Sequence, residues 1–264
     1  MKPVRLFSTD LDGTVVGNNE ATARFRDFWN ALPQETRPLL VLNSGRLIDD
    51  QLELLDSVPL PRPDYIIGGV GTMVSRQDEP ALSEAYTSQL GAAFDADKIA
   101  SIMQDVPGSS LQPERYQHGL KSSWYLHHAE KEALADIERR LNDNGVAARI
   151  VYSSARDLDI LPRAANKGAA IRWLCGHLGI GLDEVVVAGD TGNDRAMFEL
   201  PDVRGVVVAN ALEELRSFAS DKHNMFIARK EEADGVIMGL KHWMSPIPTQ
   251  KQPRNTGVRA GHLH

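Results

Sequence analysis

Two aspartates stand one residue apart near the start of the chain, in the stretch LFSTDLDGTVVGN (6–18). Asp10 and Asp12 follow an apolar run that reads as a buried strand, and Gly13 comes directly after them. Two like charges about 4 Å apart repel by about 4 kcal/mol at an effective dielectric constant of ~20. A positive charge must therefore lie beside them. Carboxylates in such a place can act as nucleophile, as acid and base, or as ligands of a cation.

Three further polar groups are expected near these aspartates. Asn43–Arg46 and Asp190–Asp194 each follow an apolar run, and Asn166–Gly168 opens the helical segment before the second of these runs. Ligands of open parallel sheets bind at the carboxyl ends of the strands, so all these groups should converge. Lys167 would then lie at a helix N-terminus, a place that favours anions.

Each group taken alone also has an ordinary structural explanation. An Asp-x-Asp pair can form a cap or a turn, and Gly13 can simply permit a tight turn. A lysine that opens a helix is usually a solvated charge, and GDTGND (189–194) can be a polar turn. Because all of them occur together at strand ends, we interpret them as one site.

The elements expected to position these groups alternate between strand and helix. Continuous apolar runs, typical of strands covered on both faces, lie at 4–10, 39–45, 64–71, 185–194 and 205–211. Helical patterns lie at 21–32, 46–58, 166–180 and 211–220. This alternation predicts an α/β fold with a doubly wound parallel sheet.

Residues 78–160 break that rhythm. Helical patterns at 95–106 and 130–145 lie among half-polar strand patterns at 120–128, 146–152 and 156–162. We therefore predict a core domain formed by 1–77 and 161–244, and a small α+β cap domain with an antiparallel sheet at 78–160. Hinges are expected near 77–80 and 161–163. The segment 245–264 lacks periodicity and predicts a disordered tail.

These motifs resemble those of the haloacid dehalogenase-like (HAD) phosphohydrolase superfamily. DLDGT (10–14) is similar to its first motif, Ser44 to its second, Lys167 to its third and GDTGND to its fourth. The resemblance covers nearly the whole chain and implies a HAD-like, Rossmannoid core. The insert lies where the family places its C2 type of cap, which implies a small-molecule substrate.

The resemblance also implies residue roles. Asp10 would be the nucleophile that forms an aspartyl-phosphate, Asp12 the general acid and base, and Lys167 a catalytic cation. The phosphate would be bound by Asp10, Ser44, Gly45, Lys167 and Asn193. Mg²⁺ would be bound by Asp10, the backbone carbonyl of Asp12, Asp190 and Asp194.

Four stretches are similar to the sucrose-phosphate phosphatase group: 63–74, 121–126, 157–170 and 185–199. This group removes phosphate from sucrose 6-phosphate or mannosylfructose phosphate, both made by a partner glycosyltransferase. The first motif here is DLDGT rather than DLDNT, which tilts the expectation towards mannosylfructose phosphate.

A sugar site needs hydrogen-bonding side chains and an apolar platform. In the predicted cap strand, Lys121 and Ser123 share one face, which we expect to cover the active site. Asp159 is a further candidate ligand for the sugar, with a cap salt bridge as the alternative. Arg46 is expected to guide the substrate, although a surface ion pair explains it nearly as well.

Composition excludes several other classes. The net charge of −7, with acids and bases interspersed, argues against nucleic acid or an anionic membrane as partner. The lone Cys175 suits a reducing compartment and reads as a buried helix residue. No apolar run is long enough for a membrane span and no signal peptide is evident, so a cytoplasmic location is expected.

The motifs leave three alternatives to a phosphatase to consider. A phosphomutase or phosphotransferase would use Asp10 identically and cannot be separated by these motifs. A non-enzymatic phospho-sugar sensor predicts loss of Asp10 or Asp12, and both are present. A dinucleotide-binding dehydrogenase is disfavoured because GGVGTMV (68–74) lacks the third glycine of its fingerprint.

Overall fold

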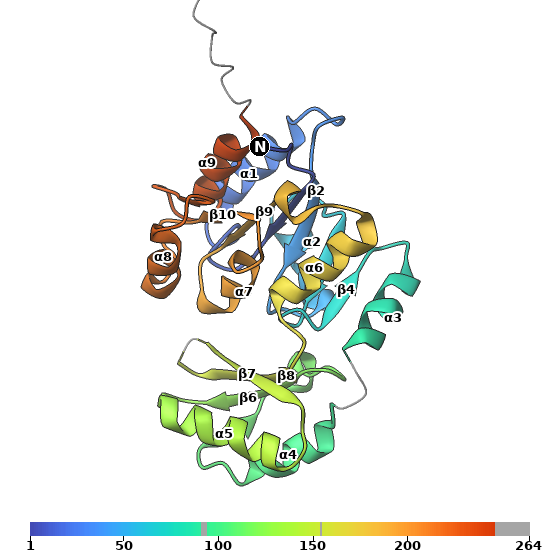
Figure 1. The fold of residues 1–264 in the computed structure, drawn as a ribbon, viewed down its shortest axis with the longest axis vertical. Coiled ribbons are helices and arrows are strands. Elements are labelled where there is room, and N and C mark those ends of the chain that lie inside the picture. Colours follow the sequence, from blue (N-terminus) through green and yellow to red (C-terminus); the bar gives the residue numbers. More distant parts are fainter. Residues whose placement is uncertain (91–93, 154, 246–264) are drawn as a thin grey trace, which may run out of the picture.

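The computed structural model describes residues 1–90, 94–153 and 155–245, and its strands form two sheets (Figure 1). The predicted tail lies outside these residues except for Ser245. In spatial order, the larger sheet consists of β11 (Met225–Ile227), β10 (Arg204–Val207), β9 (Val185–Gly189), β1 (Leu6–Thr9), β2 (Leu39–Asn43), β3 (Tyr65–Gly68) and β4 (Met73–Ser75).

The first six of these strands are parallel, and β4 pairs antiparallel with β3. The predicted doubly wound parallel sheet is thereby confirmed, with each of its five apolar runs in a strand. The edge strands β4 and β11 were not predicted. Each has only three residues, and β11 is only half buried, so neither leaves a clear apolar run in the sequence.

Helices cover both faces of the larger sheet. They are α1 (Asn19–Asn30), α2 (Ile48–Ser57), α3 (Pro80–Gln89), α6 (Lys167–Leu178), α7 (Arg195–Phe198), α8 (Glu213–Ser220) and α9 (Glu232–Met244). On β10, Gly205 lies against Phe198 of α7, and its neighbour Val206 lies against Gly239 of α9. Successive residues of a strand point to opposite faces, so α7 and α9 lie on opposite sides of the sheet.

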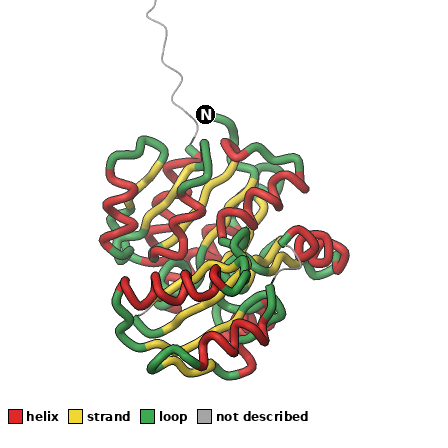
Figure 2. Tube along the Cα trace, turned by 60° about the horizontal axis from the view of Figure 1, so that its bottom comes forward, coloured by secondary structure: helices red, strands yellow, loops and turns green. Residues whose placement is uncertain are grey.

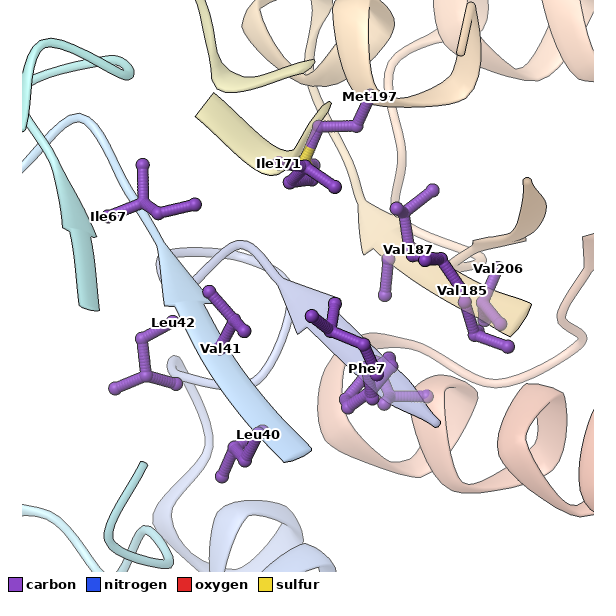
Figure 3. Close-up of a cluster of buried hydrophobic side chains, with 14 of the residues drawn as sticks. Phe7, Leu40, Val41, Leu42, Ile67, Ile171, Val185, Val187, Met197 and Val206 are labelled. Atoms are coloured by element: carbon purple, nitrogen blue, oxygen red, sulfur yellow. The ribbon is translucent and has the colours of Figure 1, made fainter. Parts of the chain in front are cut away.

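The central strands carry the main core. Phe7, Val41 and Val187, from three adjacent strands, are fully buried (Figure 3). Phe7 packs against Phe25 and Trp29 of α1, with ring centroids 6.3 and 5.8 Å away. This burial on both faces explains why the strands read as continuous apolar runs.

The smaller sheet is antiparallel, as predicted for the insert. It consists of β5 (Ser109–Leu111), β6 (Ser122–Leu126), β8 (Asp157–Pro162) and β7 (Ala148–Ser153) in spatial order. Two helices, α4 (Ala96–Gln104) and α5 (Lys131–Asp143), cover the face turned away from the larger sheet (Figures 1 and 2). Trp124 and Leu158 point into the core beneath them.

Helix α3 lies within the predicted cap segment but packs on the larger sheet. Leu82 and Tyr86 belong to the main core, and the Tyr86 hydroxyl donates to the Gly71 carbonyl at 2.6 Å. The Tyr86 ring also lies 4.9 Å from the Trp173 ring of α6, centroid to centroid. We therefore propose that the cap begins after Leu90, and not at residue 78.

Cys175 is buried in α6, where desolvation raises the pKa of its thiol to about 12, so a nucleophilic role is disfavoured. Among the described residues, no helix combines the length and the apolar character that spanning a membrane requires.

Candidate active site

Three neighbouring strands of the larger sheet end at one place. β9, β1 and β2 are adjacent and parallel, so their carboxyl ends share one edge. Asp10 follows β1, Ser44 follows β2 and Asp190 follows β9. The structure therefore brings these predicted site residues together.

Helix α6 adds a buried lysine to this edge. Asn166 caps the helix, and its side chain accepts a hydrogen bond from the Ala169 N–H at 2.7 Å. Lys167, the first residue of the helix, is fully buried. Its Nζ donates to Asp10 Oδ1 and to Asp194 Oδ1, each at 2.6 Å. One ammonium group thus bridges the buried carboxylates of Asp10 and Asp194. It supplies the positive charge that was expected beside Asp10.

The GDTGND segment is a turn that holds its own acidic side chains. Asp194 Oδ2 accepts hydrogen bonds from the N–H groups of Asp190 and Thr191, both at 3.0 Å. Asp190 Oδ1 accepts one from the Thr14 hydroxyl at 3.1 Å. Both carboxylates are therefore fixed before any ligand binds, as an electrostatic site requires.

Gly13 allows the first motif to approach the fourth. Its φ is +79°, a left-handed conformation that glycine adopts without strain. A Cβ at this position would lie 2.4 Å from Asp190 Oδ2. Any side chain here would displace that carboxylate, so this glycine is required by the site as well as by the turn.

Asp10, Asp190 and Asp194 form a group suited to a metal ion. Each is buried and offers a carboxylate oxygen, and these oxygens lie within 4.8 Å of one another. Lys167 compensates one of the three charges, which leaves an excess of negative charge among oxygen ligands. Such a donor set fits a hard divalent cation such as Mg²⁺. The Asp12 carboxylate does not belong to this group, so only its backbone carbonyl stays a proposed ligand.

Burial shifts the pKa values of this cluster. Desolvation raises the pKa of Asp10 to about 8, although the charge of Lys167 opposes the shift. Desolvation, together with the charge of Asp194, raises the pKa of Asp190 to about 6. The carboxylates around Lys167 outweigh its own desolvation and raise its pKa above the usual range. The cluster therefore favours partial protonation until a cation binds.

These shifts predict a stability that depends on pH and on divalent cations. The folded-state pKa values of Asp10 and Asp190 lie above the unfolded value, so their contribution to stability is lost as the pH rises between about 4 and 8. A cation binds the ionised form. Mg²⁺ at 100 times its Kd at pH 8 should therefore raise Tm by roughly 5–10 °C near pH 8. The same Mg²⁺ concentration should raise Tm by much less near pH 5.

Thermal unfolding with Mg²⁺ or with EDTA at both pH values measures this effect. Asp190→Asn should reduce the Mg²⁺-induced rise near pH 8, whereas Asp27→Asn on the exposed face of α1 should leave it unchanged. An equal rise at both pH values would contradict the assignment.

Asp12 and Arg46 form an ion pair at the mouth of the site. Arg46 Nε donates to Asp12 Oδ2 and Nη2 donates to Oδ1, both at 2.8 Å. The Arg46 side chain is 38% exposed and the Asp12 side chain 55%. Arg46 therefore forms the ion pair that was expected as an alternative to guiding the substrate, and its partner Asp12 is the proposed acid and base.

The active-site edge opens into a cavity of about 800 Å³ between the two sheets. Asp10, Ser44, Gly45 and Asn193 line it from the larger sheet, so the proposed phosphate ligands other than the buried Lys167 share its surface. Ser44 is itself buried, and its hydroxyl accepts the Arg46 N–H at 3.2 Å.

The smaller sheet supplies the opposite wall. Lys121 and Asp159 line the cavity and form an ion pair at 2.8 Å. Ser123 does not line the cavity, which corrects its prediction as a sugar ligand. It is fully buried beneath the wall, and its hydroxyl lies 2.7 Å from Asp159 Oδ1 and also contacts the Lys121 ammonium. Lys121 lies on the predicted strand face and lines the cavity, whereas Ser123 contacts Lys121 and Asp159 instead of reaching it.

Several residues that line the cavity were not predicted: Gln112, Tyr116, Tyr152 and Arg156. Asp157, whose spacing from Asp159 makes it a second candidate for a sugar contact or a cap salt bridge, also lines the cavity. Tyr116 lies in a short connection without periodicity, and no pattern in the sequence marks it. Arg156 opens the predicted strand pattern 156–162, but in the structure it lies in the turn before β8.

A doubly wound parallel sheet that carries DLDGT, Ser44, Lys167 and GDTGND at one edge defines a HAD-like phosphohydrolase. The chain belongs to the sucrose-6F-phosphate phosphohydrolase family, whose model matches residues 3–244. The enzyme class of this family is that of the phosphoric monoester hydrolases.

Individual relatives agree with this assignment. The chain is 65% identical to a mannosylfructose-phosphate phosphatase from Agrobacterium fabrum, over 92% of this chain and 98% of that one. It is 32% identical to sucrose-phosphatase 1 from Nicotiana tabacum, over 89% of this chain but only 58% of the tobacco protein. The sucrose-phosphatase of Synechocystis sp. PCC6803, solved with sucrose and phosphate, superposes with a TM-score of 0.82 at 26% identity, over 92% and 98% of the two chains.

Proposed function

We propose that this protein is a Mg²⁺-dependent phosphatase of a phosphorylated, fructose-containing disaccharide, with mannosylfructose phosphate as the first candidate and sucrose 6-phosphate as the second. The observation that carries the proposal is the buried cluster of Lys167 with three aspartates, of which Asp10 lines a cavity with both polar and apolar walls. The 65% identity to a mannosylfructose-phosphate phosphatase supports the order of the candidates.

In the first step, an Asp10 carboxylate oxygen attacks the phosphorus, and an O–P bond forms as the bond to the sugar oxygen breaks. Asp12 donates a proton to the departing sugar oxygen. Ser44, the backbone of Gly45, Asn193 and Lys167 hold the phosphoryl oxygens. A Mg²⁺ ion held by Asp10, the Asp12 carbonyl, Asp190 and Asp194 would supply positive charge to the transferring group.

In the second step, water attacks the aspartyl-phosphate and the Asp10–phosphorus bond breaks. Asp12, now ionised, accepts the proton of the attacking water. Asp10 returns to its carboxylate form beside Lys167, and free phosphate leaves. Every group in this cycle therefore returns to its starting state.

The cavity is large enough for a disaccharide as well as its phosphate. Its volume of about 800 Å³ lies within the usual range for small-molecule sites. The Lys121–Asp159 pair offers a donor and an acceptor to sugar hydroxyl groups, and Val70 and Tyr152 offer apolar surface. We therefore assign sugar recognition to Lys121 and Asp159. A cytoplasmic location and a partner glycosyltransferase accompany this proposal.

A panel of phosphate esters tests the proposal. It contains mannosylfructose phosphate, sucrose 6-phosphate, trehalose 6-phosphate and simple hexose phosphates, each assayed for phosphate release with Mg²⁺ and with EDTA. We expect one fructose-containing disaccharide to be preferred at least a hundredfold in kcat/KM, which corresponds to ~2.7 kcal/mol. Equal, slow hydrolysis of all esters would reject the substrate class, and no release at all would favour a mutase or a sensor.

A further inference from the structure

The segment 112–121 connects β5 to β6 and forms part of the cavity wall on the side of the smaller sheet. Three of its residues line the cavity: Gln112, Tyr116 and Lys121. The pairing of β5 with β6 stops at Leu111 and Trp124, so the strand ladder ends before this connecting segment. Other bonds must therefore hold the segment against β6.

The side chain of Gln117 supplies three of these bonds. Its Oε1 accepts a hydrogen bond from the Ser123 N–H at 2.8 Å. Its Nε2 donates to the Ser123 carbonyl at 2.8 Å and to the Gln112 carbonyl at 2.9 Å. The side-chain amide thus bonds to both backbone groups of one strand residue, as a neighbouring strand would. Its acceptor and both its donors are used inside the cap, all of them on backbone groups.

The position of the connecting segment also affects Lys121. The Tyr116 carbonyl accepts a hydrogen bond from Lys121 Nζ at 3.3 Å, and the same ammonium pairs with Asp159 at 2.8 Å. A shift of the segment would therefore move the Tyr116 side chain in the cavity wall and remove a partner of the Lys121 ammonium at the same time.

Gln117 itself is half buried and does not line the cavity. We propose that Gln117 is a positioning residue for sugar recognition, whose amide holds the connecting segment against β6 and so places Tyr116 and Lys121 in the cavity wall. The inference rests on the proposed function, because it takes this wall to be the surface that the sugar contacts. The groups proposed for phosphoryl transfer belong to the larger sheet's side, so Gln117 acts on sugar binding and leaves that step unchanged.

The test compares Gln117→Met with two control variants of the cap. The methionine is close in length to the glutamine but lacks its amide. Ser122→Ala, in the same part of the chain, removes the hydrogen bond that Trp124 Nε1 donates to Ser122 Oγ at 2.8 Å, and neither of these two residues lines the cavity. It should therefore cost stability alone. Gln104→Met, at an exposed position of α4, controls for the substitution itself.

Each variant is assayed on the best disaccharide phosphate of the panel and on p-nitrophenyl phosphate, which carries no sugar. We expect Gln117→Met to lower kcat/KM for the disaccharide phosphate about tenfold, chiefly through a higher KM, because the wall contacts the sugar both before and during the reaction. The value for p-nitrophenyl phosphate should change less than twofold. Both controls should keep the ratio of the two kcat/KM values within twofold of the wild type, even where Ser122→Ala lowers Tm.

Gln117→Glu is a second variant, in case the methionine prevents folding. It keeps the size of the side chain and the acceptor of the Ser123 N–H but loses both donated bonds, so it should show the same loss of preference for the disaccharide phosphate.

An equal loss on both substrates, an unchanged ratio in the Gln117 variants, or the same change of ratio in Ser122→Ala would overturn the inference. A wild-type protein without preference for a disaccharide phosphate would overturn the proposed function and the inference with it. A wild type that has the preference, together with Gln117 variants that keep it, would overturn the inference alone.

Discussion

Asp10→Asn should abolish turnover, with a loss of about 10⁴-fold or more in kcat, while the protein stays folded. The amide cannot form the O–P bond of the first step. It is close in shape to the carboxylate and leaves the Lys167 ammonium bonded to Asp194 at 2.6 Å. Phosphate release from the preferred substrate, measured with Mg²⁺ in excess, gives the size of the loss.

The stability of this variant provides an independent measurement. Burial raises the pKa of Asp10 to about 8, so its ionised form costs the folded state free energy without a bound cation. In EDTA near pH 8, Asp10→Asn should therefore have a Tm at least equal to that of the wild type. Addition of Mg²⁺ should also raise the Tm of this variant less than that of the wild type. Asp27→Asn, at an exposed ion pair, is the matched control and should keep full activity.

A mass increase by one phosphoryl group in the rapidly quenched wild type, absent in Asp10→Asn, would support the aspartyl-phosphate. Phosphate release from Asp10→Asn at a rate near that of the wild type would reject Asp10 as the nucleophile. A variant that fails to unfold cooperatively would instead show that the carboxylate is needed for folding, and Asp10→Glu would then separate the two roles.

Lys167→Met should be the most destabilising single change at this site. The methionine fills much of the lysine volume but leaves Asp10 and Asp194 without their shared ammonium, and all these groups are buried. Removing one partner of a buried ion pair costs about 3–5 kcal/mol. Turnover should be lost as well, because the nucleophile and the phosphoryl group lose a compensating charge.

The loss of stability should depend on pH and on Mg²⁺. Without the lysine, the ionised carboxylates repel more strongly, so the difference in unfolding free energy from the wild type should be larger near pH 8 than near pH 6. Excess Mg²⁺ should restore part of the lost stability. Denaturant unfolding measures these differences, with Lys131→Met at the exposed start of α5 as the control. A change below about 1 kcal/mol at both pH values would contradict the central role of this lysine.

The start of the cap could not be predicted from the sequence, because helix α3 packs on the larger sheet. No helix was predicted for residues 80–89, which were assigned to the cap with the rest of 78–160. Helix α3 places Leu82 and Tyr86 in the core of the larger sheet. In the structure, the Tyr86 hydroxyl bonds to Gly71 and its ring packs on α6, which attaches the helix to the larger sheet. The helix is adjacent to the cap in sequence, but in space it contacts the larger sheet and α6.

The residue types and their order along the chain determined the fold class and the composition of the site. Continuous apolar runs require strands covered on both faces, and parallel strands bring the residues after each run to one edge. The sequence alone therefore predicts that Asp10, Ser44, Lys167 and Asp190 lie together. Gly13 was recognised as a turn residue, although its close approach to Asp190 was not.

Only the tertiary structure decided which polar groups face the cavity and which bind one another. Alternation predicts the face of Ser123, but the packing of Lys121 and Asp159 above it decides that it lies beneath the wall. The pair of Arg46 with Asp12 joins residues from different loops. Such contacts depend on side-chain positions across elements distant in sequence, and these positions follow from packing and electrostatics instead of periodicity.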